Sequence, residues 1–451
     1  MDNQTPFQIK AKLFLMMVLQ FFIWGAWLPL IFGYLPSLKF TAFQQAAILN
    51  AFPIAAIVGM FFSNQFADRN FSAERFLAFS HFVGGLAIMA CGFTKDFWLF
   101  FTFMSIHCLL YVPTISITNS IAFANIKDPQ SEFGIVRMGG TIGWILAAWP
   151  FTFILVDWTK VKAANPTGIV EWIGAALGNG LTGEPLKEAT MWTFVVAGLA
   201  SILLAVFSLT LPHTPAKKTS SDSSSLAWVD AFKLLAHPFV FVLWIVAFAD
   251  SFVHNCYFNW TGSFLGAEPA KGGVGIPGNW IMPVMSIGQI AEISTMFILG
   301  ITLKNLGWRT TLIIGVLGHA VRFAVYAFFP QNQSLIILIQ ILHGICYAFF
   351  FATVYIFVDA YFPKDSRTSA QGLFNVMILG VGALVANTFC PWLFENVFST
   401  KDAAGQIVST DYRQMFLFPA AIATGAALVL LLFFHPPKAP DNSDGPIATG
   451  H

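Results

Sequence analysis

The sequence predicts an all-α membrane protein with about twelve transmembrane helices, and two observations support this prediction. Of the 451 residues, 57% are hydrophobic and only 10% are charged, whereas a soluble domain usually carries roughly 25% charged residues. The apolar residues also gather in runs of about 20, the length that an α-helix needs to cross a bilayer. Backbone amides find no water in lipid, so such runs must form helices.

The apolar runs fall into twelve segments. The first is as long as a full span and too long for the apolar part of a signal peptide, so we expect it to be retained. The fourth and tenth are the longest and could kink. The predicted spans are residues 13–32, 42–63, 76–93, 97–124, 139–156, 191–211, 239–265, 281–303, 311–329, 334–361, 370–394 and 416–434.

A polar, helix-breaking stretch divides the chain after the sixth span. It begins Leu211-Pro212-His213-Thr214-Pro215 and continues into a serine-rich segment at residues 219–225, which is typical of a linker. We therefore predict an N-terminal six-helix half (1–211), a cytoplasmic linker (212–238), a C-terminal six-helix half (239–436) and a polar C-terminal tail (437–451). Two six-helix halves around a polar loop are the layout of the major facilitator fold.

The distribution of lysine and arginine predicts the orientation. With the N-terminus inside, 13 of these residues lie on the inner side and 8 on the outer side, and cytoplasmic loops are the ones enriched in positive charge. We expect both termini in the cytoplasm. One inner loop contains Asp68, Arg69 and Arg75, and we interpret these residues as a gating motif whose charge contacts break during transport; a solvated loop is the alternative.

Several classes of function are excluded by composition. The formal net charge of +1 gives no basic field for nucleic acid. The histidines and acidic residues show no metal-ligand spacing such as HExxH, and no nucleophile–base pair is recognisable. The five cysteines lie within apolar runs and are interpreted as small hydrophobic side chains. We expect no enzyme, no cofactor, no metal and no nucleic-acid partner.

Polar residues inside the predicted spans are the candidates for function, because a charge in the bilayer interior is costly. Gln289 and Glu292 share a face of the eighth span, and Asn255 and Asn259 share a face of the seventh. Either pair could bind a ligand or hydrogen-bond to a neighbouring helix. The carboxylate favours a binding site for Gln289 and Glu292. The remaining titratable candidates within the spans are His81, His107, Asp250, His254, His319, Arg322, His343 and Asp359.

Arg137, at the start of the fifth span, is the strongest single signal. Arg137, Thr141 and Trp144 lie on one helical face. They offer a bidentate cation, a hydroxyl group and a flat aromatic surface, which suit a ligand with a ring and several oxygens. The alternative is that Arg137 only anchors the helix at the membrane surface.

The sequence resembles bacterial nucleoside:proton symporters of the major facilitator superfamily, of the nucleoside permease type. The similarity is spread over most of the chain and rests on several segments together. They are Leu19-Gln-Phe-Phe-Ile-Trp-Gly-Ala-Trp27, Tyr111-Val-Pro-Thr-Ile-Ser-Ile-Thr-Asn119, Arg137-Met-Gly-Gly-Thr-Ile-Gly143, Met285-Ser-Ile-Gly-Gln-Ile-Ala-Glu292, Arg322-Phe323 and Ser369-Ala-Gln-Gly372.

The resemblance implies a substrate site between the halves, near the middle of the membrane. Phe258 could replace Asn259 in this site, depending on a one-residue choice of register. The substrate-binding residues that the resemblance implies are Arg137, Thr141, Trp144, Asn255, Asn259, Gln289, Glu292, His343 and Tyr347.

The sequence departs from the family at the tenth span, where better-known members carry a carboxylate and this chain has Ala348. Proton coupling must then use another group or be absent. The candidates are Glu292, Asp250 and His343, and Glu292 ranks first because it would touch both proton and substrate.

The resemblance implies a monomeric secondary transporter in the bacterial inner membrane that imports nucleosides with protons by alternating access. Two alternatives remain open: a sugar or other polyhydroxy solute porter of the same fold, and an uncoupled nucleoside facilitator.

Overall fold

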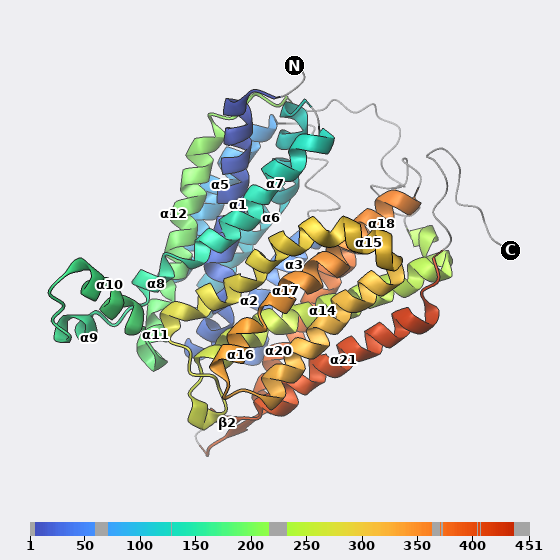
Figure 1. Ribbon diagram of the computed structural model, residues 1–451. Helices are drawn as coiled ribbons and strands as arrows, with labels where there is room; N and C mark the ends of the chain where they lie inside the picture. The colour runs from blue at the N-terminus through green and yellow to red at the C-terminus, as the bar shows by residue number, and fades with distance from the viewer. Residues whose placement is uncertain are drawn as a thin grey trace.

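The computed structural model describes residues 5–58, 71–127, 129–215, 232–362, 370, 373–403, 405 and 407–436. These residues form an almost entirely helical protein whose two halves lie as two bundles that meet along one side (Figure 1). Most of the predicted linker and the whole predicted tail (437–451) lie outside the described residues, as do Asp68 and Arg69 of the gating motif.

The helices of the first half begin at residues suited to that position. The Asp96 side chain accepts a hydrogen bond from the Leu99 amide, and Thr41 and Gln44 form a reciprocal capping box. The elements are α1 (Phe7–Ser37), α2 (Ala42–Leu49), α3 (Ala51–Val58), α5 (Ala73–Phe93), α6 (Phe97–Asn125), α7 (Pro129–Ala148), α8 (Phe151–Ile154) and α12 (Met191–Ser208).

The second half contains one very long helix, α15, that covers two predicted spans. Gly307 breaks it with a φ of 72°, a conformation that glycine adopts at little cost. The elements are η2 (Leu234–Ala236), α14 (Pro238–Gly266), η3 (Pro269–Lys271), α15 (Gly278–Phe328), α16 (Gln333–Leu338), α17 (Ile341–Cys346), η4 (Tyr347–Ala352), α18 (Thr353–Tyr361), η5 (Val376–Val381), α20 (Gly382–Asn396) and α21 (Tyr412–Phe433).

The predicted fold class is confirmed, and each predicted span is mostly helical where it is described. Within the described residues, nine helices are long and apolar enough to cross a membrane, and α15 accounts for two spans. The tenth span is indeed irregular, because the π-helical segment η4 interrupts it between α17 and α18. The fifth helix begins at Pro129 rather than at residue 139, so Arg137 lies within α7 and not at its start.

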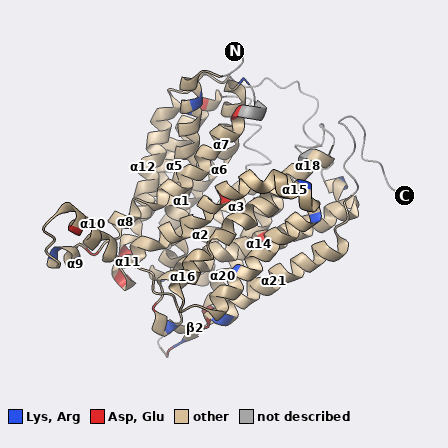
Figure 2. Cartoon of the chain, viewed as in Figure 1, with Lys and Arg blue, Asp and Glu red and all other residues tan. Residues whose placement is uncertain are grey.

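Charged residues lie mostly at the ends of the bundles, and few lie along their middle (Figure 2). This distribution is expected for spans in lipid, because a charge in the bilayer interior is costly and needs a partner or a function. The few interior charges are therefore the positions at which to look for a site.

Glycine allows α7 to pack directly on α1. A Cβ atom built on Gly143 would lie 2.0 Å from the Val18 carbonyl oxygen, and one on Gly25 would lie 3.2 Å from Trp144. Small residues at helix interfaces let membrane helices approach closely. This contact sets the position of the whole Arg137–Trp144 face.

An insertion between α8 and α12 projects from the first half (Figure 1). It contains α9 (Trp158–Ala163), α10 (Ile169–Gly178) and α11 (Gly183–Ala189), while a hairpin of β1 (Ser399–Lys401) and β2 (Ile407–Thr410) belongs to the second half. The end of α10 bonds to the start of α15: the Trp280 indole N–H donates to the Leu177 carbonyl at 2.8 Å, and the Gly278 amide donates to the Leu181 carbonyl at 3.1 Å.

These contacts close one end of the protein. Hydrogen bonds between the halves, among the described residues, come from two parts of the first half. One is the segment 152–181, and the other is the α2–α3 region, where Gln45 donates to Glu395 and Asn50 to Thr388. The N-terminus lies at the opposite end (Figure 1). The closed end is therefore the one that carries α10.

We predict that Trp280→Phe weakens this closure, because phenylalanine keeps an aromatic ring but lacks the N–H that donates to the Leu177 carbonyl. One such bond contributes about 1 kcal/mol, roughly a fivefold change in the open fraction. The measurement is the maleimide labelling rate, from the α10 side, of a cysteine placed at Met282; the native cysteines are buried. Trp158→Phe is the control, since Trp158 stacks on Trp172 within the insertion. Equal labelling rates in both variants would contradict the prediction.

Candidate transport site

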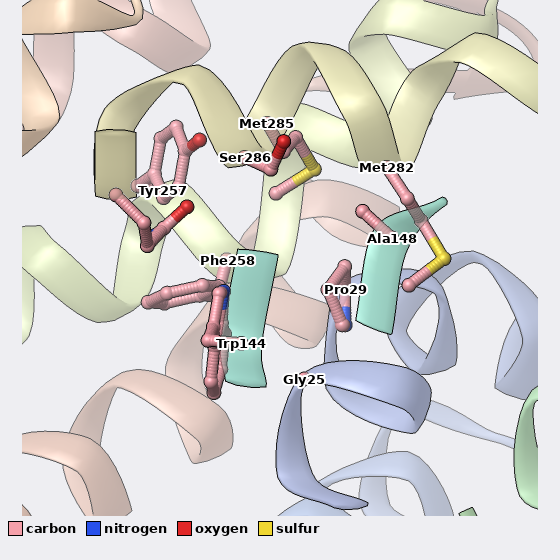
Figure 3. Close-up of a pocket in the computed structure, with 10 residues that line it drawn as sticks. Gly25, Pro29, Trp144, Ala148, Tyr257, Phe258, Met282, Met285 and Ser286 are labelled. Atoms are coloured by element: carbon pink, nitrogen blue, oxygen red, sulfur yellow. The ribbon is translucent and has the colours of Figure 1, made fainter. Parts of the chain in front are cut away.

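A small pocket lies where the two halves meet, and both halves line it. The side chains of Tyr257, Phe258 and Trp144 stand on one side of it in Figure 3, and Met282 and Pro29 on the other. The lining residues are Gly25 and Pro29 of α1, Trp144 and Ala148 of α7, Tyr257 and Phe258 of α14, and Met282, Met285, Ser286 and Gln289 of α15. Two residues predicted from sequence, Trp144 and Gln289, thus share one pocket.

Trp144 belongs to an aromatic wall that crosses between the halves. Its ring meets Phe258 of the second half edge-on at 6.2 Å and Trp24 of α1 at 5.2 Å, and Trp24 stacks on Phe52 at 4.7 Å. Such a wall offers flat apolar surface to a planar ligand. Sequence reasoning did not single out Trp24, although it lies within the first segment of the family resemblance.

Gln289 presents an unsatisfied acceptor to the pocket. Its side chain is 7% exposed, and its Oε1 atom has no hydrogen-bond partner among the described residues. A buried polar group without a partner costs about 1–3 kcal/mol. A ligand that donates a hydrogen bond would remove this cost.

Glu292 lies one turn beyond Gln289 on the same helix and is half-buried. The Arg137 guanidinium of the first half lies close enough to Glu292 for an electrostatic interaction, and its other face packs on the Phe21 ring at 4.2 Å. Thr141 and Tyr347 are also half-buried. The two charges of the predicted site therefore approach each other from opposite halves.

The two asparagines of α14 point in different directions. Asn255 is half-buried and donates to the Ser251 carbonyl at 2.8 Å. Asn259 is buried and donates to Asn387 of α20 at 3.0 Å, an interhelical bond of the kind that holds membrane helices together. Phe258, the other register choice, lines the pocket instead.

His343 lies behind the pocket. It is 2% exposed, accepts from Arg322 at 3.0 Å and lies against the Tyr257 ring, with 4.5 Å between ring centroids. Asp250 is further behind, 3.7 Å from His319. Of the three proton-coupling candidates, only Glu292 therefore lies on the pocket side. Arg75 of the gating motif is exposed near the start of α5.

The pocket is closed in this conformation. Its free volume is about 10 Å³, room for roughly one water molecule. Sequence reasoning did not single out Tyr257, Met282, Met285 or Ser286, because apolar and small side chains in an apolar span give no signal of their own. Occupancy by a solute requires the walls contributed by the two halves to separate.

Comparison with known proteins decides the family. The family model described as "Nucleoside H+ symporter" matches residues 7–179 and 167–439 of this chain. The chain belongs to the nucleoside H+ symporter family. It is therefore a transporter and not an enzyme, and it is a multi-pass membrane protein of a bacterial symporter family.

Three bacterial proteins are similar to this chain over most of their length. YegT of Escherichia coli strain K12 is 30% identical, and the match covers 94% of this chain and 93% of YegT. The xanthosine permease of the same organism is 26% identical, and the match covers 84% of this chain and 86% of the permease. The nucleoside permease NupG of the same organism is 27% identical, and the match covers 94% of this chain and 96% of NupG.

Solved structures confirm the major facilitator fold of this symporter. The crystal structure of the nucleoside transporter NupG superposes with a TM-score of 0.75 at 23% identity, covering 95% of this chain and 100% of that one. The D-xylose–proton symporter superposes with a TM-score of 0.64 at 14% identity, covering 95% and 98%. At these identities the likeness shows the fold alone.

Proposed function

We propose that this transporter imports nucleosides together with protons. The observation that supports this proposal best is the pocket itself, in which the aromatic wall around Trp144 stands with the unpaired amide oxygen of Gln289. A nucleoside joins a flat base to a sugar with several hydroxyl groups. A cavity that binds it needs a stacking surface and a few placed polar groups.

In this proposal the two halves of the protein bind different parts of the nucleoside. Trp144 supplies the face for the base, and the Gln289 oxygen and the Glu292 carboxylate accept hydrogen bonds from sugar hydroxyls. Arg137 offsets the Glu292 charge or donates to a base carbonyl. Thr141, Asn255 and Tyr347, all half-buried, complete the proposed contacts. We assign Asn259 and His343 supporting roles, because each bonds to another helix.

The names of the relatives support the same substrate class. The xanthosine permease and NupG are named for nucleoside transport, and their similarity extends through both halves of the site. A sugar porter is the alternative, since carboxylate and amide acceptors also suit hexose hydroxyls. The aromatic wall favours the nucleoside, because a base needs a stacking surface.

We further propose that the protein lies in the bacterial inner membrane as a monomer, with both termini in the cytoplasm. The excess of lysine and arginine on that side supports this orientation. The closed end bearing α10 is then the outer end. Import would require the two halves to rock about the pocket and open that end.

Uptake of a labelled nucleoside panel into proteoliposomes tests the proposal. We expect uridine or adenosine uptake well above protein-free vesicles, competed by other nucleosides and not by hexoses. No uptake by protein that is present in the membrane would overturn the substrate class. Competition by hexoses alone would favour the sugar porter.

A further inference from the structure

A buried charged cluster lies in the second half, behind the Tyr257 wall of the pocket. Asp250 is 1% exposed, and His319 and Arg322 are fully buried. His343 is bonded to Arg322, and His254 stacks on His343 with 4.9 Å between ring centroids. The cluster thus joins α14, α15 and α17.

Arg322 determines where the histidine protons lie. Its two terminal nitrogens contact His343 Nδ1 at 3.0 Å and His319 Nδ1 at 2.9 Å. A guanidinium group only donates hydrogen bonds, so both Nδ1 atoms must accept. The proton of each neutral ring is then on Nε2. His319 Nε2–H consequently faces the Asp250 carboxylate, with 3.7 Å between Nε2 and Oδ1.

Asp250 is the group in this cluster that is best placed to bind a proton. Neither carboxylate oxygen has a hydrogen-bond partner among the described residues. An ionised carboxylate in this position lacks the donors that would stabilise it, and binding a proton removes that cost. Arg322 occupies the Nδ1 atoms of His319 and His343, which leaves His254 Nδ1 as the other free acceptor.

One buried histidine in the first half has both ring nitrogens bonded, whereas Nε2 of another, His107, has no partner among the described residues. His81 Nδ1 bonds to Ser201 at 3.0 Å, and its Nε2 bonds to Gln20 at 2.9 Å. Both ring nitrogens are satisfied, as expected of a purely structural network. The Asp250 cluster is different because it holds a buried carboxylate with neither oxygen bonded.

The cluster contacts the pocket through Tyr257 and His343. The Arg322 guanidinium lies 4.2 Å above the Tyr257 ring, and Tyr257 lines the pocket. His343 packs on Gly288, where an added Cβ atom would lie 2.7 Å from the histidine Cβ. Gly288 precedes Gln289 directly. A change in charge next to Arg322 can therefore shift the pocket lining through two packed contacts, Arg322 on Tyr257 and His343 on Gly288.

The other elements packed on α14 bring no competing charge to Asp250; in α1, Lys10 pairs with Glu132 and Lys12 donates to the Thr210 carbonyl. In the described parts of α20 and α21, the charged residues Glu395 and Arg413 lie at helix ends and contact Gln45 and Phe328. Within the described residues, η5 has no titratable side chain. The titratable and charged groups around Asp250 are His254, Tyr257, His319, Arg322, Tyr326, His343 and Cys346.

We propose that Asp250 binds the proton that crosses with the substrate, and that His319, Arg322 and His343 are positioning residues that transmit its charge to the pocket. The proton adds to one Asp250 oxygen on one side of the membrane and leaves from it on the other. The proton-bound cluster carries one more positive charge than the empty one. This inference rests on the proposed nucleoside–proton symport and specifies the group that performs the coupling.

The test compares accumulation with exchange in the same proteoliposomes. With the membrane potential held at zero and an inward gradient of one pH unit, one-for-one symport supports about tenfold accumulation of labelled uridine. We expect the wild type to approach this ratio and Asp250→Asn to stop at equal concentrations. We also expect Asp250→Asn to retain uridine exchange, at a rate that no longer depends on pH between about 5 and 8. Glu188→Gln, which changes an exposed carboxylate on α11, is the control and should accumulate like the wild type.

Each outcome bears on the inference. Accumulation by Asp250→Asn equal to that of the wild type would refute it while leaving nucleoside symport intact. Absence of binding and exchange in the wild type would refute the proposed function as well. If Asp250→Asn does not fold because Arg322 loses its counterion, the neutral pair Asp250→Asn with Arg322→Gln is measured instead. Exchange without accumulation in that pair supports the inference, and restored accumulation overturns it.

Discussion

Replacing Glu292 with glutamine is expected to weaken nucleoside binding by about 1–3 kcal/mol, roughly five- to 150-fold in Kd. The substitution keeps the shape of the side chain and removes the charge that would accept from sugar hydroxyls. Glu292 is half-buried and has no hydrogen bond or ion pair within the described part of the chain, so the variant should fold normally. Equilibrium binding of labelled uridine to the purified protein measures the effect.

Thr302→Ala provides a control on the same helix. The Thr302 hydroxyl bonds to the Ile298 carbonyl of its own turn and does not line the pocket. Its Kd should match that of the wild type. An unchanged Kd in Glu292→Gln would show that the substrate contacts lie elsewhere, whereas a 2′-deoxynucleoside should bind more weakly to the wild type if hydroxyls are read by this carboxylate.

Substituting Gly143 is expected to have the second large effect, on folding. Even the methyl group of alanine would lie 2.0 Å from the Val18 carbonyl oxygen, and a backbone atom cannot rotate away. Overpacking of this kind costs about 1–3 kcal/mol or more. We expect Gly143→Ala to lower both the yield of monodisperse protein and its thermal unfolding temperature in detergent.

Gly134→Ala is the matched control, because Gly134 lies on the same helix and a Cβ atom there meets nothing within 4 Å. Alanine has a higher helix propensity than glycine, so this variant should be as stable as the wild type or slightly more stable. Equal losses in both variants would show that α7 does not tolerate alanine for reasons other than contact with α1.

In the proposed mechanism, proton coupling and substrate binding occupy two layers of side chains. The pocket lining includes Trp144 and Gln289, with Glu292 one turn further along α15, and the second layer contains Asp250 and Arg322, with Tyr257 between them. Thermodynamic coupling needs the two ligands to bias one shared state, and it does not need them to touch. The ranking that places Glu292 first among the coupling candidates rests on direct contact. The geometry of the second layer offers Asp250 as the alternative that the accumulation experiment decides.

The sequence alone determined that this protein lies in a lipid bilayer, where its spans run approximately, and which residues share a helical face. Apolar runs of about 20 residues can only be satisfied as helices in lipid, and each predicted span is mostly helical where it is described. The shared face of Gln289 and Glu292 follows from the helical repeat. Family membership was also predictable, because the family's motifs are spread through the chain. The assignment does not depend on any one of these motifs.

Only the tertiary structure decided which helix each polar face meets. Helical periodicity places Asn255 and Asn259 on one face, but only packing shows that Asn259 bonds to Asn387 while Phe258 reaches the pocket. The cluster of Asp250 and Arg322 joins residues far apart in sequence. The start of α7 was likewise invisible to hydropathy, whereas the break at Gly307 falls between two predicted spans. The physical reason is that helix formation is local, whereas the neighbour of a helical face depends on close contacts such as that between Gly143 and Val18.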